Sequence, residues 1–465
     1  MKHKFSLLAL ALLLLPCIPA WAAGSPWDDM KTLEASIERT SFPKADFNIV
    51  SFGAVANRPD KLCTKAINTA ILTCSSKGGG RVIVPKGVFY TGGITLKSNV
   101  NLYLAEGAIL RFSTNQKDYL PTVLTRWEGM DCYNIQPLLY AYNESNIAVT
   151  GKGTIDGQGS MEHWWPMCGA AKFGWKEGII SQRTGRPKLQ TAEQAMTPVE
   201  QRVMTLEDGM RPQMFSPYKC NKVLVEGVTF IRAPFWVMHP LMCENVVVSG
   251  VRVQNHGPNG DGCDPESCNK VLIEKCYFET GDDCIAIKSG RNNDGRKWNM
   301  PSQNMIVRDC EMKDGHGGVV IGSEISGGYK NLYVDNCKMD SPNLERVIRI
   351  KTSTCRGGTI ENVFVRNVTV GQCRECVLKI DLLYESREQC RRDFPPTVRN
   401  VFMENVTCQK SDYGVSIDGL PDLTNVYNIN VKDCKFNGVK HGNKVTGAKD
   451  VKFTDLFING KKSDL

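Results

Sequence analysis

The chain has 465 residues, a formal net charge of +8 and an ordinary 42% share of hydrophobic residues. Its basic residues form no block, which gives little support to a nucleic-acid-binding protein, and no later apolar stretch is long enough to span a membrane. A mildly basic surface suits a polyanionic partner, although a charge of +8 spread over this length can equally be without function.

The amino-terminus has the pattern of a secretory signal peptide over residues 1–22. A basic start is followed by the apolar run Leu7–Leu15 and by small residues before a cleavage site near Ala22. Cys17 directly follows a proline, which is a poor match to a lipoprotein box, so lipid anchoring is not expected. We therefore predict a secreted or periplasmic protein.

After the signal peptide we predict an amino-terminal segment over residues 23–46 and a single catalytic domain over residues 47–465. A helical pattern around Trp27–Ile37 has no evident role. A clearer helix is predicted over Asp60–Cys74, with Asp60 as its cap and one apolar face. We expect this helix to cover the open amino-terminal end of the sheets that begin near Arg81.

Short strand units recur along most of the chain, at spacings of roughly twenty to forty residues. Most begin at an asparagine, which tolerates left-handed backbone and whose amide can form ladders in stacked turns. Because no helices lie between most of the units, the predicted fold is all-β, a single-domain right-handed parallel β-helix with an amino-terminal capping helix. Examples of the units are Asn146–Val149, Asn245–Val248, Asn331–Val334 and Asn400–Met403.

The 19 cysteines are typical of a disulfide-rich exported protein, but their placement favours another interpretation for many of them. Several lie within or just after a strand unit, where cysteine behaves as a small buried hydrophobe. We therefore expect a minority of disulfides, no metal and no cofactor. The cysteines placed in this way are Cys243, Cys276, Cys310, Cys337, Cys408 and Cys434.

Two stretches near residues 160–217 and 291–301 interrupt the repeat. The first contains several tryptophans and a helical pattern through Met196–Leu206, and the second is polar. Insertions in a solenoid project from one face, which is often the binding face. We predict that both form walls of a cleft.

Acidic residues gather in two short segments that are about one coil apart. Asp261 and Asp282 are separated by 21 residues, so they should lie on adjacent rungs about 4.8 Å apart. Asp282 and Asp283 can reach one cleft only if one of them lies at a bend. Such carboxylates cannot all ionise easily, which suits an acid and a base acting on a glycosidic bond. A calcium site or turn-capping aspartates would be the simpler alternative.

Further polar candidates follow in the chain. His316 stands between two glycines, although a lone histidine is more often structural. Arg349 and Lys351 share one strand face and suit a substrate carboxylate, although an isolated pair of this kind is more often solvated. We add Asn259 and Tyr384 as candidate substrate contacts, and Tyr384 is as readily a core residue.

The segments Asn259–Asp261, Gly281–Asp283, Gly315–Gly317 and Arg349–Lys351 resemble, in order and spacing, the N-T-D, G-D-D, G-H-G and R-I-K motifs of the polygalacturonases, glycoside hydrolase family 28. The resemblance extends from about Phe47 to the carboxyl-terminus. It implies hydrolysis of α-1,4-galacturonosyl linkages in pectin or polygalacturonate with inversion. Gly260 stands where the family usually has threonine, which puts the fit of the substrate in doubt but not the mechanism.

The resemblance also implies roles for individual residues. Asp282 would be the general acid, Asp261 and Asp283 would activate water, and His316 would belong to the catalytic site. Arg349 and Lys351 would bind a substrate carboxylate. The expected partner is a pectic polysaccharide or oligogalacturonide, and we expect a monomer.

Three other functions stay open at this point. They are a calcium-dependent pectate lyase, a rhamnogalacturonan or other pectin-backbone hydrolase, and a carbohydrate-binding spike without activity. Arg349 and Lys351 favour galacturonate next to the cleaved bond. The two insertions favour exo action, because they could close one end of the groove and turn it into a pocket.

Overall fold

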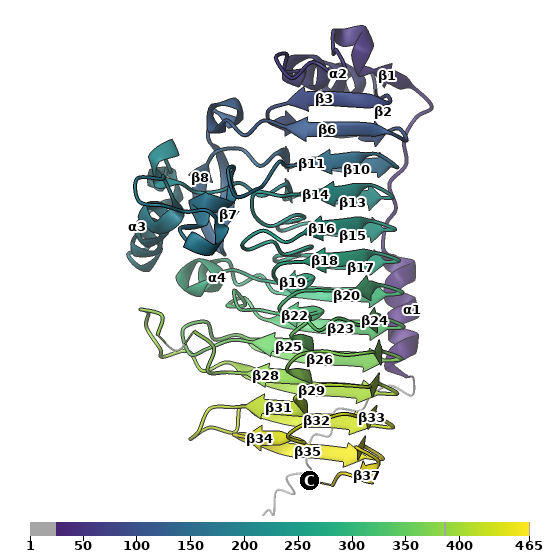
Figure 1. Ribbon diagram of the computed structural model, residues 1–465, viewed down its shortest axis with the longest axis vertical. Helices are drawn as coiled ribbons and strands as arrows, with labels where there is room; N and C mark the ends of the chain where they lie inside the picture. Colours follow the sequence, from purple (N-terminus) through teal and green to yellow (C-terminus); the bar gives the residue numbers. More distant parts are fainter. Residues whose placement is uncertain (1–24, 386, 465) are drawn as a thin grey trace, which may run out of the picture.

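The computed structural model describes residues 25–385 and 387–464, and these form a parallel β-helix (Figure 1). The chain passes through three sheets in turn, and strands of successive coils pair in parallel, except for the last pair of the second sheet, which is antiparallel. The predicted all-β solenoid is confirmed. The predicted signal peptide, residues 1–22, lies outside the described residues, and none of the described helices is long and apolar enough to cross a membrane.

Two sheets of thirteen strands form two walls of the coil. Sheet A consists of β1 (Asp46–Asn48), β2 (Gly80–Val84), β5 (Val100–Leu104), β10 (Ser145–Gly151), β13 (Asn221–Glu226), β15 (Glu244–Ser249), β17 (Asn269–Glu274), β20 (Ser302–Arg308), β23 (Tyr329–Asp335), β26 (Thr359–Arg366), β29 (Thr397–Glu404), β32 (Val426–Lys432) and β35 (Ala448–Thr454). Sheet B consists of β3 (Gly87–Thr91), β6 (Ala108–Phe112), β11 (Thr154–Asp156), β14 (Thr229–Ile231), β16 (Arg252–Asn255), β18 (Tyr277–Thr280), β21 (Glu311–Met312), β24 (Lys338–Met339), β27 (Thr369–Val370), β30 (Thr407–Cys408), β33 (Lys435–Phe436), β36 (Phe457–Ile458) and β37 (Lys461–Lys462).

The third wall, sheet C, has two groups of strands that isolated bridges through Met238 and Cys263 connect. The first group is β4 (Ile94–Thr95), β9 (Leu139–Tyr142) and β12 (Phe215–Tyr218). The second group is β19 (Ile285–Ile287), β22 (Val319–Ile321), β25 (Arg346–Lys351), β28 (Cys376–Asp381), β31 (Tyr413–Asp418) and β34 (Lys444–Thr446).

A ladder of asparagines runs along the start of sheet A. Each side-chain amide donates to the amide oxygen of the asparagine one coil before, at 2.8–2.9 Å. Each donating asparagine also has a positive φ, between 55° and 64°, as the sequence predicts. The ladder fixes the register of successive coils. Its members are Asn269, Asn304, Asn331, Asn362, Asn400 and Asn428.

The interior of the coils is one hydrophobic cluster that extends from Ile49 to Leu456. The six repeat cysteines named above are buried and unpaired, which confirms that they act as small core residues. One disulfide, Cys355–Cys390, occurs among the described residues, so the expected minority of disulfides is confirmed there.

Two helices precede or open the solenoid. α2 (Thr64–Ser76) lies at its amino-terminal end and packs against β1 and β2 (Figure 1). It begins four residues later than predicted, because the Asp60 carboxylate pairs with Arg58 and does not cap the helix. That α2 prevents association through this end stays a prediction. α1 (Pro26–Ser36) packs instead on the outer face of sheet A, against β17 and β20.

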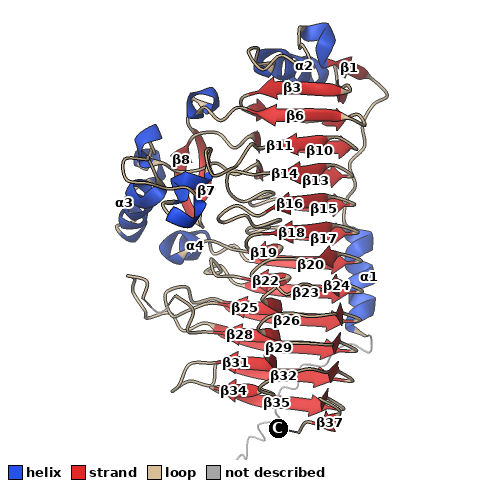
Figure 2. Cartoon of the chain, viewed as in Figure 1, coloured by secondary structure: helices blue, strands red, loops and turns tan. Residues whose placement is uncertain are grey.

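A hairpin that precedes the two predicted insertions projects from the same side of the coils as they do, and the insertions contain the remaining α-helices (Figure 2). The hairpin is formed by β7 (Val123–Trp127) and β8 (Met130–Asn134), and the helices are α3 (Gln182–Gln194) and α4 (Asn292–Trp298). The predicted helix through Met196–Leu206 is wrong, because that stretch contains only two short 3-10 turns. Pro198 stands near its start, and α3 lies earlier in a polar segment that apolar periodicity does not reveal.

Candidate active site

The outer face of sheet C carries the candidate residues. In β25 the side chains of Ile348 and Ile350 lie in the core, so Arg349 and Lys351 point outward. The strand register places Arg349 in a row of outward-pointing residues, which we call the outer row. It runs through His239, Asp264, Ala286, Val320, Arg349, Lys379, Ser416 and Lys444.

The structure brings the three predicted aspartates together at one edge of this face. One carboxylate oxygen each of Asp261, Asp282 and Asp283 lies within 4.8 Å of the others. The backbone N–H of Gly262 donates to the Asp283 carbonyl at 3.0 Å, so Asp283, rather than Asp282, is the neighbour of Asp261 on the adjacent rung. Asp282 and Asp283 both lie in the bend before β19, as their sharing of one cleft requires.

This separation is shorter than the ~6.5–9.5 Å expected between the acid and the base of an inverting glycosidase. The reason lies in the fold. Asp282 and Asp283 are consecutive residues on one rung, and Asp261 lies on the rung before, so the backbone and the rise of a coil set the spacing of the three carboxylates instead of the width of a sugar ring. The distance alone therefore does not determine the stereochemistry.

The three carboxylates differ in environment. Asp261 is 3% exposed, and burial together with the charges of Asp264 and Asp282 raises its pKa well above the usual range. Burial alone would also raise the pKa of Asp282, but the hydrogen bond and charge of His316, with the charge of Lys351, lower it to about 2. Burial and the neighbouring negative charges therefore favour the protonated form of Asp261, whereas His316 and Lys351 favour the ionised form of Asp282.

His316 contacts Asp282 directly. Its Nδ1 lies 3.0 Å from the Asp282 carboxylate, and this hydrogen bond raises the pKa of the imidazole. Its backbone N–H donates to the Asp282 carbonyl at 3.2 Å. Gly315 has φ +131°, and a Cβ there would lie 2.4 Å from the same carbonyl oxygen, so glycine permits this close approach. The side chain of His316 is 47% exposed and faces the open part of the site.

Arg349, Lys351 and Tyr384 form the second part of the site. Lys351 Nζ donates to Asp283 at 2.7 Å, and Arg349 lies 3.9 Å from the other oxygen of the same carboxylate. Burial opposes the charge of Lys351, but Asp283 raises the pKa of its ammonium group. The Tyr384 ring lies 5.3 Å from each cation. Arg349 Nε is buried and has no hydrogen-bond partner among the described residues.

The side chain of Asn259 contacts an arginine of the protein and not the aspartates. Its side-chain oxygen accepts a hydrogen bond from Arg211 at 2.7 Å, and its φ is 51°. Arg211 also donates to the carbonyls of Pro234 and Pro258, so this contact fixes the turn that leads to Asp261. A direct contact of Asn259 with substrate stays a prediction.

Sequence reasoning missed three buried charged residues beside the aspartates. Lys288 Nζ lies 3.0 Å from Glu324 and 4.0 Å from Asp264, and it stands 4.5 Å from the Trp236 ring. Both carboxylate oxygens of Asp264 lack a hydrogen-bond partner among the described residues. The alternation of β19, with Ile285 and Ile287 in the core, could have placed Lys288 on the outer face.

The coils before the aspartates are covered by the insertions. Arg126 of β7 pairs with Glu266 on the outer face of sheet C at 3.1 Å, and Glu266 contacts His239 at 2.8 Å. Arg202 of the 160–217 insertion pairs with Asp294 of α4 at 2.5 Å. A second hydrophobic cluster joins the hairpin, the 160–217 insertion and the coil after β14, and it consists of Trp127, Met130, Cys132, Leu189, Met204, Met210, Phe235 and Trp236.

Two groups of side chains have donors suited to a divalent cation. One is the aspartate trio itself. The other is His256, Glu279 and Asp314, whose donor atoms also lie within 4.8 Å of one another. The absence of a metal from the reaction stays a prediction, which chelation would test.

The chain resembles known proteins in sequence and in fold. The sequence matches the model of Glycosyl hydrolases family 28 over residues 203–419. The crystal structure of a hyperthermoactive exopolygalacturonase from Thermotoga maritima superposes with a TM-score of 0.90 and 39% identity, covering 94% of this chain and 97% of that one. An exo-poly-alpha-D-galacturonosidase from Dickeya chrysanthemi is 26% identical over 95% of this chain and 75% of its own length.

A probable polygalacturonase from Vitis vinifera is 29% identical over 70% of this chain, and the match spans 60% of the length of that relative. Identity of 39% over almost the whole length of a solved member is well beyond a likeness of fold alone. The carboxylates, the histidine and the Arg-Lys pair lie together at one site of a fold of the same kind. The chain therefore belongs to glycoside hydrolase family 28.

Proposed function

We propose that the protein hydrolyses α-1,4-galacturonosyl linkages of polygalacturonate from one chain end, with inversion. The single observation that carries this proposal is the position of the aspartate trio. It lies between a cationic pair and a covered part of sheet C. The two relatives named as exo-acting support the same mode of action.

The cationic pair supports a uronic acid as substrate. Arg349 and Lys351 point outward beside the aspartates, 7% and 6% exposed, with Tyr384 over both. A guanidinium and an ammonium in one partly desolvated site bind a carboxylate strongly. A rhamnogalacturonan hydrolase would place a neutral sugar at one side of the cleaved bond, so this pair favours galacturonate on its side.

The covered coils support exo action. A polymer that threads through an open groove needs free sheet surface on both sides of the aspartates. On the amino-terminal side the residues of the outer row are buried under the insertions, whereas the Asp282–His316 side of the site is open. A chain end fits such a pocket, and an internal segment does not.

The residues divide the reaction between them as follows. Asp282 delivers a proton to the glycosidic oxygen as the C–O bond breaks, and a water molecule attacks C1 from the opposite face. Asp283, which accepts a hydrogen bond from Lys351, takes the proton of that water. Asp261 orients the water. His316 Nδ1 lies 3.0 Å from the Asp282 carboxylate, so this imidazole supplies the proton that Asp282 delivers.

Proton NMR of the first products on polygalacturonate tests this mechanism. Inversion at an α-linkage releases the β-anomer first, whereas a covalent intermediate would release the α-anomer. Unsaturated products that absorb in the ultraviolet, lost on chelation, would instead support the lyase alternative.

A further inference from the structure

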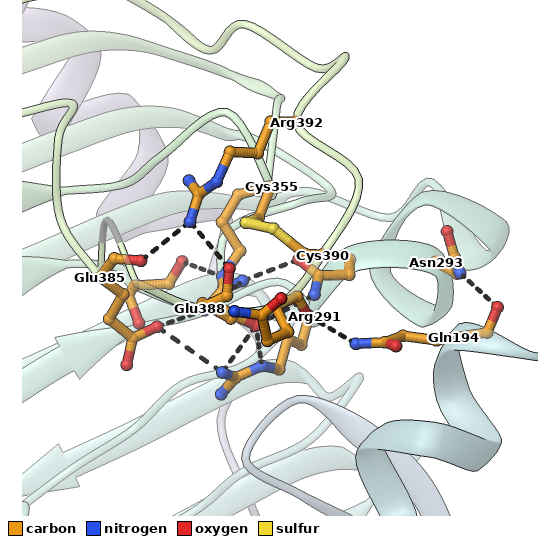
Figure 3. Close-up of a disulfide and its surroundings, with 12 residues drawn as sticks. Gln194, Arg291, Asn293, Cys355, Glu385, Glu388, Cys390 and Arg392 are labelled. Carbon is orange, nitrogen blue, oxygen red and sulfur yellow. Dashed lines mark hydrogen bonds and ion pairs between the residues drawn. A yellow bond between two sulfur atoms is a disulfide. The ribbon is translucent and has the colours of Figure 1, made fainter.

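The connection between β28 and β29 carries Tyr384 and is joined to three other segments of the molecule. We call its described residues, 382–385 and 387–396, the Tyr384 loop. Its first part places the Tyr384 ring against Arg349 and Lys351. Its later part is tied to neighbouring segments covalently and by ion pairs (Figure 3).

The covalent tie is the disulfide Cys355–Cys390, with a Cα–Cα distance of 5.8 Å. Cys355 lies in the turn directly after β25, the strand that carries Arg349 and Lys351. The disulfide therefore connects the Tyr384 loop to the strand that the tyrosine faces. The repeat cysteines named above serve the core, whereas this pair lies outside the coils.

A cluster of buried ion pairs surrounds the disulfide. Glu388 contacts Arg291 at 2.8 Å and Arg356 at 2.7 Å, and Glu385 contacts Arg356 at 2.7 Å. Both arginines are fully buried or nearly so, at 2% and 0% exposure. Buried charges of this kind hold their geometry, because separating one partner leaves the other uncompensated.

The same cluster reaches the other insertions. Arg291 directly precedes α4 and lies 3.5 Å from Glu128 in the turn between β7 and β8. Gln194 at the end of α3 donates to the backbone carbonyl of Gln389 at 2.6 Å. The hairpin, α3, α4 and the Tyr384 loop therefore form one connected wall beside the site.

We propose that the Cys355–Cys390 disulfide and the Glu388 ion pairs determine specificity by holding the Tyr384 loop as part of the wall that closes the site to internal chain segments. Tyr384 touches the cations that receive the substrate carboxylate. Glu388 and the two cysteines act through Tyr384, so they are positioning residues. This inference rests on the proposed exo action.

The test compares the wild-type protein with a Cys355→Ser/Cys390→Ser double variant and with Glu388→Gln. A Cys168→Ser variant, at an unpaired cysteine in the 160–217 insertion, is the matched control. For each protein, kcat and KM are measured on digalacturonate, and the first products from polygalacturonate are identified by length, with and without a dithiol reductant. Thermal unfolding verifies that each variant is folded.

The proposal predicts that KM for digalacturonate rises about tenfold in the double variant while kcat changes less than about threefold, because substrate positioning is lost and the chemistry is kept. Oligomers should join monogalacturonate among its first products. A dithiol reductant should raise KM for digalacturonate in the wild-type protein and in Cys168→Ser. It should leave the KM of the double variant unchanged. Glu388→Gln should raise KM in the same direction without reductant, and reductant should raise it further, because this variant keeps the Cys355–Cys390 disulfide.

Unchanged KM and unchanged product length in both the folded double variant and Glu388→Gln would overturn the inference. A wild-type protein that releases oligomers from the outset would contradict the proposed exo action instead. The two failures are distinguishable. Failure of the loop inference is seen by comparing the variants with the wild-type protein, whereas failure of the proposed exo action is seen in the wild-type protein alone.

Discussion

The two ends of the outer row of sheet C differ sharply although they belong to one sheet. At the amino-terminal end of the row, up to the rung of Asp261, His239 and Asp264 are fully buried. Beyond Arg349, Lys379 is partly exposed and the side chain of Lys444 is 50% exposed. The positions are equivalent by strand register, so the sheet itself does not cause the difference.

The two ends differ in the segments and side chains that cover them. The buried end is sealed by charged pairs, such as Arg126–Glu266, and by an aromatic core, whereas the exposed end carries Lys379 and Lys444 paired to Asp418. Insertions, and not the coils, therefore decide how much of a solenoid face a polymer can reach. The aspartates lie at the boundary between the two ends.

The largest effect is expected at that boundary. Asp282→Asn removes the proton donor, so kcat should fall by about 10²- to 10⁴-fold with little change in thermal unfolding. Asp418→Asn, a carboxylate on the exposed end of the same face, is the control and should change kcat only slightly. If Asp282→Asn kept a tenth of wild-type kcat, Asp282 would not be the acid.

A substitution at the buried end of the outer row should lower the free energy of unfolding. Glu266→Gln leaves the buried Arg126 and His239 without their shared carboxylate, which should lower the free energy of unfolding by about 3–5 kcal/mol. Urea unfolding measures this loss. The control Glu361→Gln removes a partly exposed pair with Arg399 and should cost about 0–1 kcal/mol. Equal losses in the two variants would mean that the covered end is not sealed by its charges.

The substrate cations should show an intermediate effect. Lys351→Met should reduce kcat/KM on galacturonate oligomers by an amount corresponding to about 2–4 kcal/mol, because a partly desolvated charge on the substrate carboxylate is lost. Lys444→Met, at the exposed end of the outer row, should leave kcat/KM nearly unchanged. An unaltered kcat/KM for Lys351→Met would exclude Lys351 from substrate binding.

The smallest effect concerns pH. In the wild-type protein the pKa of His316 is raised above its ordinary value of 6.5, so the proton shared with Asp282 is lost, and activity falls, as pH rises through that raised pKa. His316→Ala leaves only carboxyl groups to hold this proton, so the alkaline limb of kcat/KM should move to lower pH by about one unit or more. His441→Ala, which packs on Tyr413 in the last coils, should leave the limb in place. An unmoved limb in His316→Ala would contradict the proton supply through this imidazole.

Much of the fold could be predicted from the sequence, because its signals are local and repeated. Asparagine at the start of strand units indicates left-handed turns, and the structure has them at Asn304 and Asn428 with the amide ladder between. The helix α3 could not be predicted in this way. It is polar and its position depends on contacts with β8 and α4, which are distant in the sequence.

Some residues of the site could likewise be predicted from the sequence, and others could not. Asp261, Asp282 and Asp283 are recognisable because one coil of spacing brings them together. Lys288 and Asp264 carry no motif, and their burial depends on which insertion covers them. The raised pKa of Asp261 and the lowered pKa of Asp282 likewise depend on desolvation and on the contact with His316, which spacing does not reveal.

The most direct test of the account is the time course of products from polygalacturonate with the wild-type protein. Reducing ends and viscosity are measured in the same sample, and the products are separated by length. The account predicts monogalacturonate as the first and main product while viscosity stays high. A rapid fall in viscosity with a ladder of oligogalacturonides would show that both ends of the groove are open, which would contradict the account.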